Sequence, residues 1–293
     1  MSIRTQGHKC RMSFSPCCGV LCAVIVFFLS GCAGTITKPL SVCPGKSNAA
    51  EALDALQSQS QNKIPLFARG NCSIKYYENN EEKKQHLSIK VFLIKPPSEI
   101  YIQASAGVVD KAVVLGSNAK EFWLEAKPEQ ISKYWWGLWS EQNHDAGIMI
   151  NPRTLLEALG IAEIDTDEEG WSLSNEGAFD VLTKTSQNAT IKKIYIYCCD
   201  YRIRKIEYFD NHGVPSAVAQ LDDYRELSQG LFIPFKIVIN SMSEIIEDSL
   251  VVNLTLESVK PATEKQQKFS IVRSQPKGFD HIYRVINGQP IEQ

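Results

Sequence analysis

The chain has 293 residues, with 31 lysines and arginines against 33 aspartates and glutamates. The first 31 residues hold three basic residues and no acidic one, so the remainder has 28 basic and 33 acidic residues and a net charge of −5. This balance argues against a nucleic-acid partner, which requires a basic face, and against electrostatic binding to a membrane. The length is sufficient for one large domain with a sizeable core.

An apolar run at residues 14–32 follows the basic N-terminal stretch, in the layout of a secretory signal. The run ends in Leu-Ser-Gly-Cys32 and resembles the lipobox of bacterial lipoproteins, in which the cysteine sulfur carries a diacylglycerol and cleavage leaves that cysteine first. We therefore expect a signal peptide at residues 1–31 and a lipid on Cys32. An uncleaved signal anchor and a cut elsewhere remain as alternatives, because the run is almost long enough to span a bilayer.

The lipid on Cys32 would place the rest of the chain outside the cytoplasm. Ala33 follows, and the absence of aspartate at this position suggests sorting to the outer membrane, with the domain facing the periplasm. Residues 32–48 are rich in Gly, Thr, Pro and Ser, and we interpret them as a tether. We assign residues 49–293 to a single domain.

Four cysteines remain after the signal peptide and the lipidated residue: Cys43, Cys72, Cys198 and Cys199. An exported chain with an even number of cysteines can form disulfides. We expect a Cys43–Cys72 bridge between the start of the mature chain and the first strand. Cys198 and Cys199 are adjacent, so on a strand they face opposite ways and rarely bridge each other, and buried free thiols are the alternative for this pair. No Cys/His spacing resembles a zinc site, so we expect no metal.

The first half of the domain begins with a short amphipathic helix at residues 49–59, which Asn48 can cap. The period of the apolar residues then changes from helical to two, which is typical of half-buried strands. The expected strands are residues 67–78, 85–95, 99–106, 111–117 and 120–125. Together they form an antiparallel meander with one apolar face.

The middle of the chain is aromatic and then helical. A connecting segment at residues 131–139 carries Tyr134, Trp135, Trp136 and Trp139. Four aromatic residues so close together cannot all enter one small core, so we expect part of the cluster at a rim, in contact with membrane or cargo. Packing of these rings between helix and sheet is the alternative. A helix follows at residues 151–160, with Asn151 as its cap and Gly160 as its stop.

The second half returns to strands, expected at residues 179–186, 191–200, 202–210, 214–227, 231–240 and 250–260. With about 10–11 strands and two or three short helices, the sequence predicts a mainly β (α+β) fold. The expected architecture is a strongly curved antiparallel sheet, an incomplete β-barrel covered by the helices.

Residues of period two on a curved sheet converge on its concave side. From both halves we expect a ligand cavity there, lined by Leu87, Ile89, Val91, Ile100, Ile102, Leu124, Ile237, Ile239, Leu254 and Leu256. The same residues would equally make an ordinary core.

The order of these elements resembles the LolA/LolB-like periplasmic lipoprotein carriers and receptors. The resemblance runs over residues 49–282 and is carried by Phe67-Ala-Arg-Gly, Glu121-Phe-Trp-Leu, Ile206-Glu-Tyr-Phe-Asp and Ile233-Pro-Phe. It implies an incomplete barrel whose apolar cavity holds acyl chains beneath the helices. The expected lipid anchor makes this chain similar to the membrane-tethered receptor of that family. The Trp-rich segment at residues 134–139 departs from the family layout.

No catalytic set is present in the sequence, which contains neither G-x-S-x-G nor a Walker A motif. We therefore expect no enzyme and no cofactor. The expected function is binding of acyl chains of lipids or lipoproteins by a membrane-tethered envelope lipoprotein. The alternative is a non-catalytic structural or assembly lipoprotein that uses the curved sheet as a protein-binding platform.

Overall fold

Fifteen strands in one open, curved sheet form most of the structure over the residues that it describes. The structure is a computed structural model that describes residues 40–60, 64–78, 81–127, 132–141, 152–159, 170–186, 189–210, 212–228, 230–242 and 249–293. Residues 41–293 belong to one unit. The fold class predicted from the sequence is confirmed.

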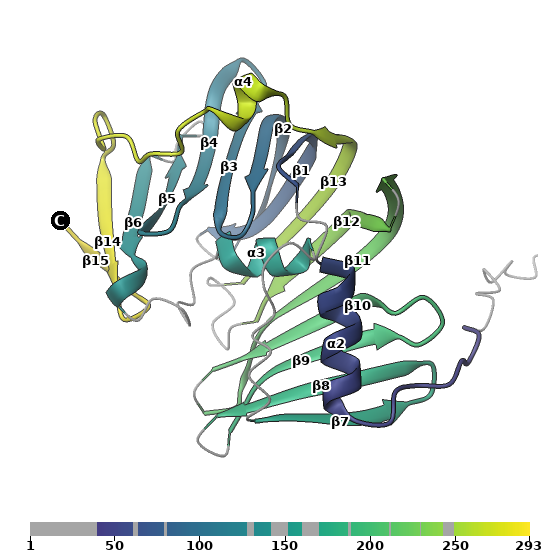
Figure 1. Cartoon of the computed structure of the whole chain (residues 1–293). Helices are drawn as coiled ribbons and strands as arrows, with labels where there is room; N and C mark the ends of the chain where they lie inside the picture. Colours follow the sequence, from purple (N-terminus) through teal and green to yellow (C-terminus); the bar gives the residue numbers. More distant parts are fainter. Residues whose placement is uncertain are drawn as a thin grey trace, which may run out of the picture. The chain divides into compact units, whose positions relative to one another are not determined.

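The strands follow the chain as two meanders that meet in the middle of the sheet. They are β1 (Leu66–Glu78), β2 (Glu81–Lys95), β3 (Glu99–Ala106), β4 (Val109–Ser117), β5 (Glu121–Ala126), β6 (Lys133–Leu138), β7 (Trp171–Glu176), β8 (Phe179–Ser186), β9 (Ala189–Tyr197), β10 (Arg202–Phe209), β11 (Pro215–Ser228), β12 (Leu231–Ser241), β13 (Leu250–Pro261), β14 (His281–Ile286) and β15 (Gln289–Glu292). Their order is β15-β14-β6-β5-β4-β3-β2-β1-β13-β12-β11-β10-β9-β8-β7. Antiparallel pairing of β1 with β13 joins the two meanders (Figure 1). The pair β6 and β14 is parallel.

Two short helices lie against one face of the sheet, which we call the inner face. Helix α2 (Ala49–Ser60) contacts β7 and β8, and helix α3 (Pro152–Ala158) contacts β4 and β11 (Figure 1). Both helices were predicted from the sequence, and each buries an apolar stripe at helical spacing. Asn151 and Gly160, the predicted cap and stop of the second helix, lie outside the described residues. The buried residues are Ala52, Leu53 and Leu56 in the first helix and Leu155, Leu156 and Leu159 in or directly after the second.

The opposite, outer face of β2–β6 is covered by a segment that the sequence prediction missed. This C-terminal strap (residues 262–280) leaves β13 through the short helix α4 (Glu264–Gln267) and crosses to β14, as the yellow chain in Figure 1 shows. Ile271 of the strap packs with Leu93, Trp123 and Tyr134 of the sheet. Asn118 donates a hydrogen bond to the Ile271 carbonyl at 3.0 Å, and Tyr134 donates one to the Ser274 carbonyl at 2.9 Å. The strap therefore gives this part of the sheet a second apolar cover.

The sheet has more strands than the predicted 10–11. Strands β6, β7, β14 and β15 were not expected. Strands β6 and β14 show no regular alternation of apolar and polar residues, β15 is only four residues long, and the alternation of Trp171-Ser-Leu-Ser in β7 was overlooked. The aromatic residues of β6 are apolar on both faces, since the strap covers one side. A continuous apolar run of this kind does not by itself identify a strand from the sequence.

Candidate functional site

The candidate site is the apolar interior between the inner face of the sheet and helices α2 and α3. One contiguous cluster of buried side chains, the inner core, joins both helices to strands of both meanders. Eight of the ten residues expected to line a cavity are buried in it: Leu87, Ile89, Ile100, Ile102, Ile237, Ile239, Leu254 and Leu256. The structure thus brings the two halves of the expected set together.

The other two expected residues are placed differently. Leu124 is partly buried at the border of the inner core. Val91 lies on the outer face, against the cluster that the C-terminal strap covers, so its assignment to the cavity was wrong. The reason is a β-bulge in β2: Ile89 pairs with Ala104 and Val91 with Gln103, which leaves Lys90 unpaired and reverses the alternation.

The same bulge explains two residues that the sequence analysis missed. Beyond it, Phe92 and Ile94 point to the inner face and are almost completely buried. The second meander supplies further members: Ile194 and Ile196, which alternate along β9, and Ile203 and Ile206, which lie on either side of a register shift in β10. The period-two pattern of Ile194-Tyr-Ile196 was visible in the sequence and would have identified that part of the set.

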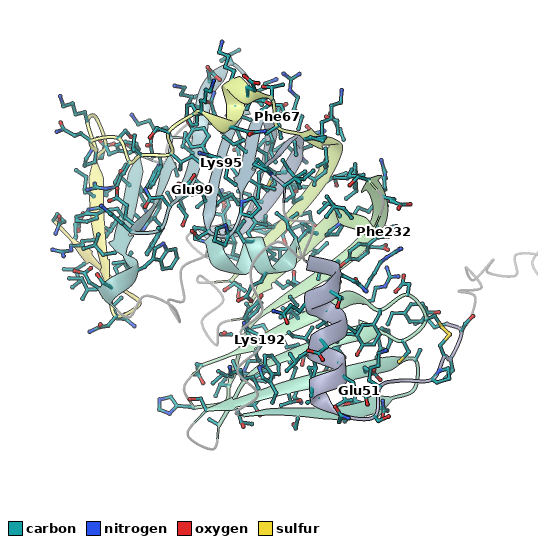
Figure 2. The ribbon with its side chains drawn as sticks, viewed as in Figure 1. Glu51, Phe67, Lys95, Glu99, Lys192 and Phe232 are labelled. Carbon is teal, nitrogen blue, oxygen red and sulfur yellow. A yellow bond between two sulfur atoms is a disulfide. The ribbon has the colours of Figure 1, made fainter. Side chains whose placement is uncertain are left out.

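Helix α2 is fixed at both ends. The N-cap residue is Asn48, whose Oδ1 accepts a hydrogen bond from the Glu51 N–H at 2.9 Å. The Glu51 carboxylate in turn accepts a hydrogen bond from the Ser47 N–H at 3.1 Å. Figure 2 labels Glu51 at this end of the helix. Near the other end, the Gln59 amide donates to the Tyr201 carbonyl at 3.1 Å. The bonds at the first end cap the helix, and the Gln59 bond ties its other end to the turn between β9 and β10.

Besides its buried leucines, helix α3 has one carboxylate that contacts the sheet at the border of the inner core. Glu157 accepts hydrogen bonds from Lys192 Nζ at 2.9 and 3.0 Å and from the Tyr208 hydroxyl at 3.1 Å. The charged pair remains about one-quarter exposed, with side-chain exposures of 24% for Lys192 and 23% for Glu157, so its charges stay in contact with water. The interior beneath the helix is left to apolar side chains.

The disulfide differs from the one predicted. Cys43 is bonded to Cys199, 156 residues away in sequence, with 5.0 Å between the Cα atoms. Cys72 is a free thiol that packs against the inner core, and its burial raises the pKa to about 12. The expected Cys43–Cys72 bridge is therefore wrong, because the chain before α2 runs to the turn between β9 and β10 instead of to β1. The yellow bond in Figure 2 marks the bridge.

The aromatic cluster belongs to β6 and the 3₁₀ turn η1 (Trp139–Glu141), and not to a connecting segment. Tyr134 and Trp139 are buried, so their assignment to an exposed rim was wrong. Trp136 is half-buried, and two guanidinium groups lie over its ring, with their central carbons 4.1 Å (Arg273) and 5.1 Å (Arg284) from the ring centroid.

Trp135 is also half-buried, on the inner face beside Phe122 and Val285. It stacks on Tyr283, with 5.7 Å between ring centroids and 17° between ring planes. His281, which is exposed, extends this stack with a centroid distance of 6.3 Å to Tyr283. Of the four aromatic residues expected at a rim, Trp135 is the one whose ring lies in a partly exposed aromatic stack.

Few polar groups enter the buried part of the chain. The buried polar residues among those described are Ser105, Ser117 and Asp180. Ser105 donates to the Asp110 carboxylate at 2.9 Å, whereas the hydroxyl of Ser117 has no hydrogen-bond partner within the described part of the chain. Ser117 pairs with Ile100 of β3 and Phe122 of β5, so its side chain shares the inner face with theirs.

Over the described ranges, no group of three or more His, Cys, Asp or Glu side chains is arranged to hold a metal ion. No helix in the same ranges is long and apolar enough to cross a membrane. Cys32 and residues 142–151 lie outside the described residues.

No protein-family model matches the chain, and a search of curated proteins gives no match. Among solved structures, it is similar to a proposed outer membrane lipoprotein-sorting protein domain from Vibrio parahaemolyticus, with 12% identity and a TM-score of 0.48 over 75% of this chain and 95% of that one. A LolA superfamily protein from Nitrosomonas europaea has 11% identity and a TM-score of 0.47, covering 77% and 98%. A DUF1329 family protein from Desulfovibrio piger has 7% identity and a TM-score of 0.46, covering 73% and 92%. At identities of 12% or less and TM-scores below 0.5, these similarities assign the chain neither a family nor a function.

Proposed function

We propose that this protein is a membrane-tethered envelope lipoprotein that binds acyl chains of lipids or lipoproteins in its apolar interior. The observation that carries the proposal is the inner core, in which both meanders present aliphatic side chains to two short helices. An acyl chain needs a concave apolar surface with few polar groups. The helices that cover this surface contribute three buried aliphatic residues each, which a flexible hydrocarbon chain can replace at similar hydrophobic free energy.

Export is supported by the disulfide. Bridges persist in oxidising compartments such as the periplasm and are rare in the cytosol. Cys43 and the segment that follows it are attached to the sheet, so the free part of the proposed tether would run only from Cys32 to about Val42. Val42 is exposed, as expected for a residue where a tether leaves the domain.

The lipid anchor is tested by Cys32→Ser. This variant removes the sulfur that would carry the diacylglycerol, so the protein should become soluble or remain uncleaved. Fractionation and mass of the full chain measure both outcomes, and Cys72→Ser controls for the loss of a cysteine. Unchanged membrane association and unchanged mass in Cys32→Ser would remove the anchor from the proposal.

Binding is tested by placing a charge in the interior. Ile102 is 9% exposed in the inner core, and Ile102→Asp would put a carboxylate in the acyl path. If the interior opens to ligand, the carboxylate can be hydrated there, so the variant should fold with a modest loss of stability and stop binding a fluorescent long-chain fatty acid. Val108→Asp is the matched control, because Val108 is fully exposed in a turn.

The alternative is a structural lipoprotein whose sheet serves as a protein-binding platform. It is favoured by one specific observation: the eight aliphatic residues brought together in the inner core are all at most 9% exposed, as in a solid core. A buried unpaired carboxylate then costs several kcal/mol. In that case Ile102→Asp fails to fold, the wild-type protein takes up no acyl probe, and lipid extraction followed by mass spectrometry finds no co-purifying lipid.

The partly exposed stack of Trp135, Tyr283 and His281 is our candidate for contact with membrane or cargo. Aromatic rings with one apolar side and one hydrated side suit the headgroup region of a bilayer. The short tether would keep the domain close to that surface.

A further inference from the structure

Three cysteines meet where the chain enters the domain. The entry segment (residues 41–48) is joined to the turn between β9 and β10 by the Cys43–Cys199 bridge. The neighbouring residue in that turn, Cys198, is a free thiol. A thiol adjacent in sequence to a disulfide is a potential nucleophile toward it, since exchange proceeds by attack of a thiolate on a disulfide sulfur.

The thiol of Cys198 is held by a carboxylate that the proposed function does not use. Asp180 of β8 is completely buried, and its Oδ1 accepts hydrogen bonds from the Asn175 amide at 2.6 Å and from Cys198 Sγ at 3.4 Å. Its Oδ2 accepts bonds from the Lys46 N–H at 2.8 Å and the Tyr201 hydroxyl at 3.2 Å. A carboxylate has about four lone-pair sites, so the four donors fill them.

This arrangement keeps Cys198 protonated. Burial raises the pKa of the Cys198 thiol, and the hydrogen bond and negative charge of Asp180 raise it further. The S–H group donates to Asp180, so loss of its proton would leave two negative charges in contact. The reactive thiolate form is thereby disfavoured.

The position of the entry segment is also matched to Asp180. A Cβ atom built on Gly45 would lie 2.1 Å from Asp180 Oδ1 and 2.3 Å from the Asn175 amide nitrogen. Only glycine fits this close approach. Sliding the segment by one residue would bring a side chain against the carboxylate, so Gly45 and Asp180 together define the register in which Cys43 meets Cys199.

We propose that Cys43, Cys198 and Cys199 form a thiol–disulfide exchange site, which Asp180 holds in the Cys43–Cys199 pairing. In the exchange, the Cys198 sulfur attacks the Cys43 sulfur, the bond to Cys199 breaks, and the proton lost by Cys198 is taken up at Cys199. One disulfide and one thiol are present before and after, so no external oxidant or reductant is needed. Asp180 is the positioning residue that selects one of the two pairings.

The second pairing is within reach of a small displacement. Adjacent Cα atoms are about 3.8 Å apart, so Cys198 lies at most about 8.8 Å from Cys43 when Cys199 lies 5.0 Å from it. Disulfides join Cα atoms separated by roughly 4.4–6.8 Å. Val42, near the start of the segment, is largely exposed, so a shift there costs little burial of its side chain.

The test uses variants of the full chain in a Cys72→Ser background. Cys198→Ser leaves Cys43 with its observed partner, and Cys199→Ser leaves it with Cys198 alone. Each detergent-solubilised protein is reduced with dithiothreitol and reoxidised with glutathione disulfide. N-ethylmaleimide then traps free thiols, and tandem mass spectrometry of tryptic peptides identifies the bridge.

Cys198→Ser should form the Cys43–Cys199 bridge at the rate of the parent protein. Cys199→Ser should form the Cys43–Cys198 bridge at least about tenfold more slowly than that, because the rate of exchange depends on the availability of the thiolate. Adding Asp180→Asn to Cys199→Ser should restore bridge formation, and Asp180→Asn alone should give a mixture of both pairings. Equal rates in the two serine variants would overturn the proposal, and this comparison decides even if the Asp180 variants do not fold. A folded Asp180→Asn protein with only the Cys43–Cys199 bridge would overturn it as well.

Discussion

Replacing Cys43 and Cys199 together by serine should lower the free energy of unfolding by several kcal/mol. The bridge joins residues 156 positions apart, so it closes more than half of the chain into a loop. It also ties the entry segment, and through it α2, to the β9–β10 turn. The double variant loses both constraints.

The magnitude follows from the length of the loop. The chain-entropy relation for a loop closed over 156 residues gives a stabilisation of about 5 kcal/mol at 25 °C. Residual structure in the unfolded chain reduces this value, and native disulfides typically contribute about 2–5 kcal/mol. We therefore expect a loss of about 3–5 kcal/mol, a large share of the stability of an ordinary domain.

Urea denaturation of the oxidised parent protein and of the double variant measures the difference. Cys72→Ser/Cys198→Ser is the matched control, because it removes two cysteines and leaves the bridge in place. Its loss should be smaller than that of the bridge variant. A loss below about 1 kcal/mol on removing Cys43–Cys199 would refute the reasoning, because it would mean that the bridge constrains neither the unfolded chain nor α2.

Three further outcomes are expected. Ser117→Ala should raise the free energy of unfolding by about 1 kcal/mol, because it removes a buried hydroxyl without a partner in the described ranges. Ser105→Ala should lower the free energy of unfolding, because it removes the hydrogen bond to Asp110. Urea denaturation measures both changes, and a loss of stability in Ser117→Ala would contradict the expectation. Burial raises the pKa of Tyr134 from 10.0 to about 12. The protonated Tyr134 side chain therefore contributes its full stability below pH 10, and this contribution is lost as the pH rises toward 12. Tyr134→Phe should flatten the dependence of stability on pH over that range, and an unchanged pH dependence would contradict this expectation. Liposomes should shift the tryptophan fluorescence of the parent protein to the blue, and Trp135→Phe should remove the shift; an equal shift in both proteins would exclude Trp135 as the contact.

Much of the fold was predictable from local patterns. The alternation in residues 233–239 and 250–256 fixes which side chains share a face, because the period of a strand is two wherever its ladder is regular. The helices α2 and α3 were predictable for a similar reason, since an apolar stripe at helical spacing specifies the buried side of each helix, and the Asn48 cap specifies the start of α2. These features predicted the curved sheet, its helical cover and eight residues of the candidate site.

The remaining features depend on contacts between residues far apart in the chain. Val91 lies on the outer face because a bulge in the ladder between β2 and β3 reverses the alternation, and an extra residue in a strand leaves no mark in a pattern of apolar residues. Tyr134 is buried because the C-terminal strap, about 140 residues later, crosses its face of the sheet. Cys43 pairs with Cys199 and not with Cys72 because tertiary structure brings the entry segment to the β9–β10 turn, and sequence spacing carries no information on which sulfur atoms lie within bonding distance.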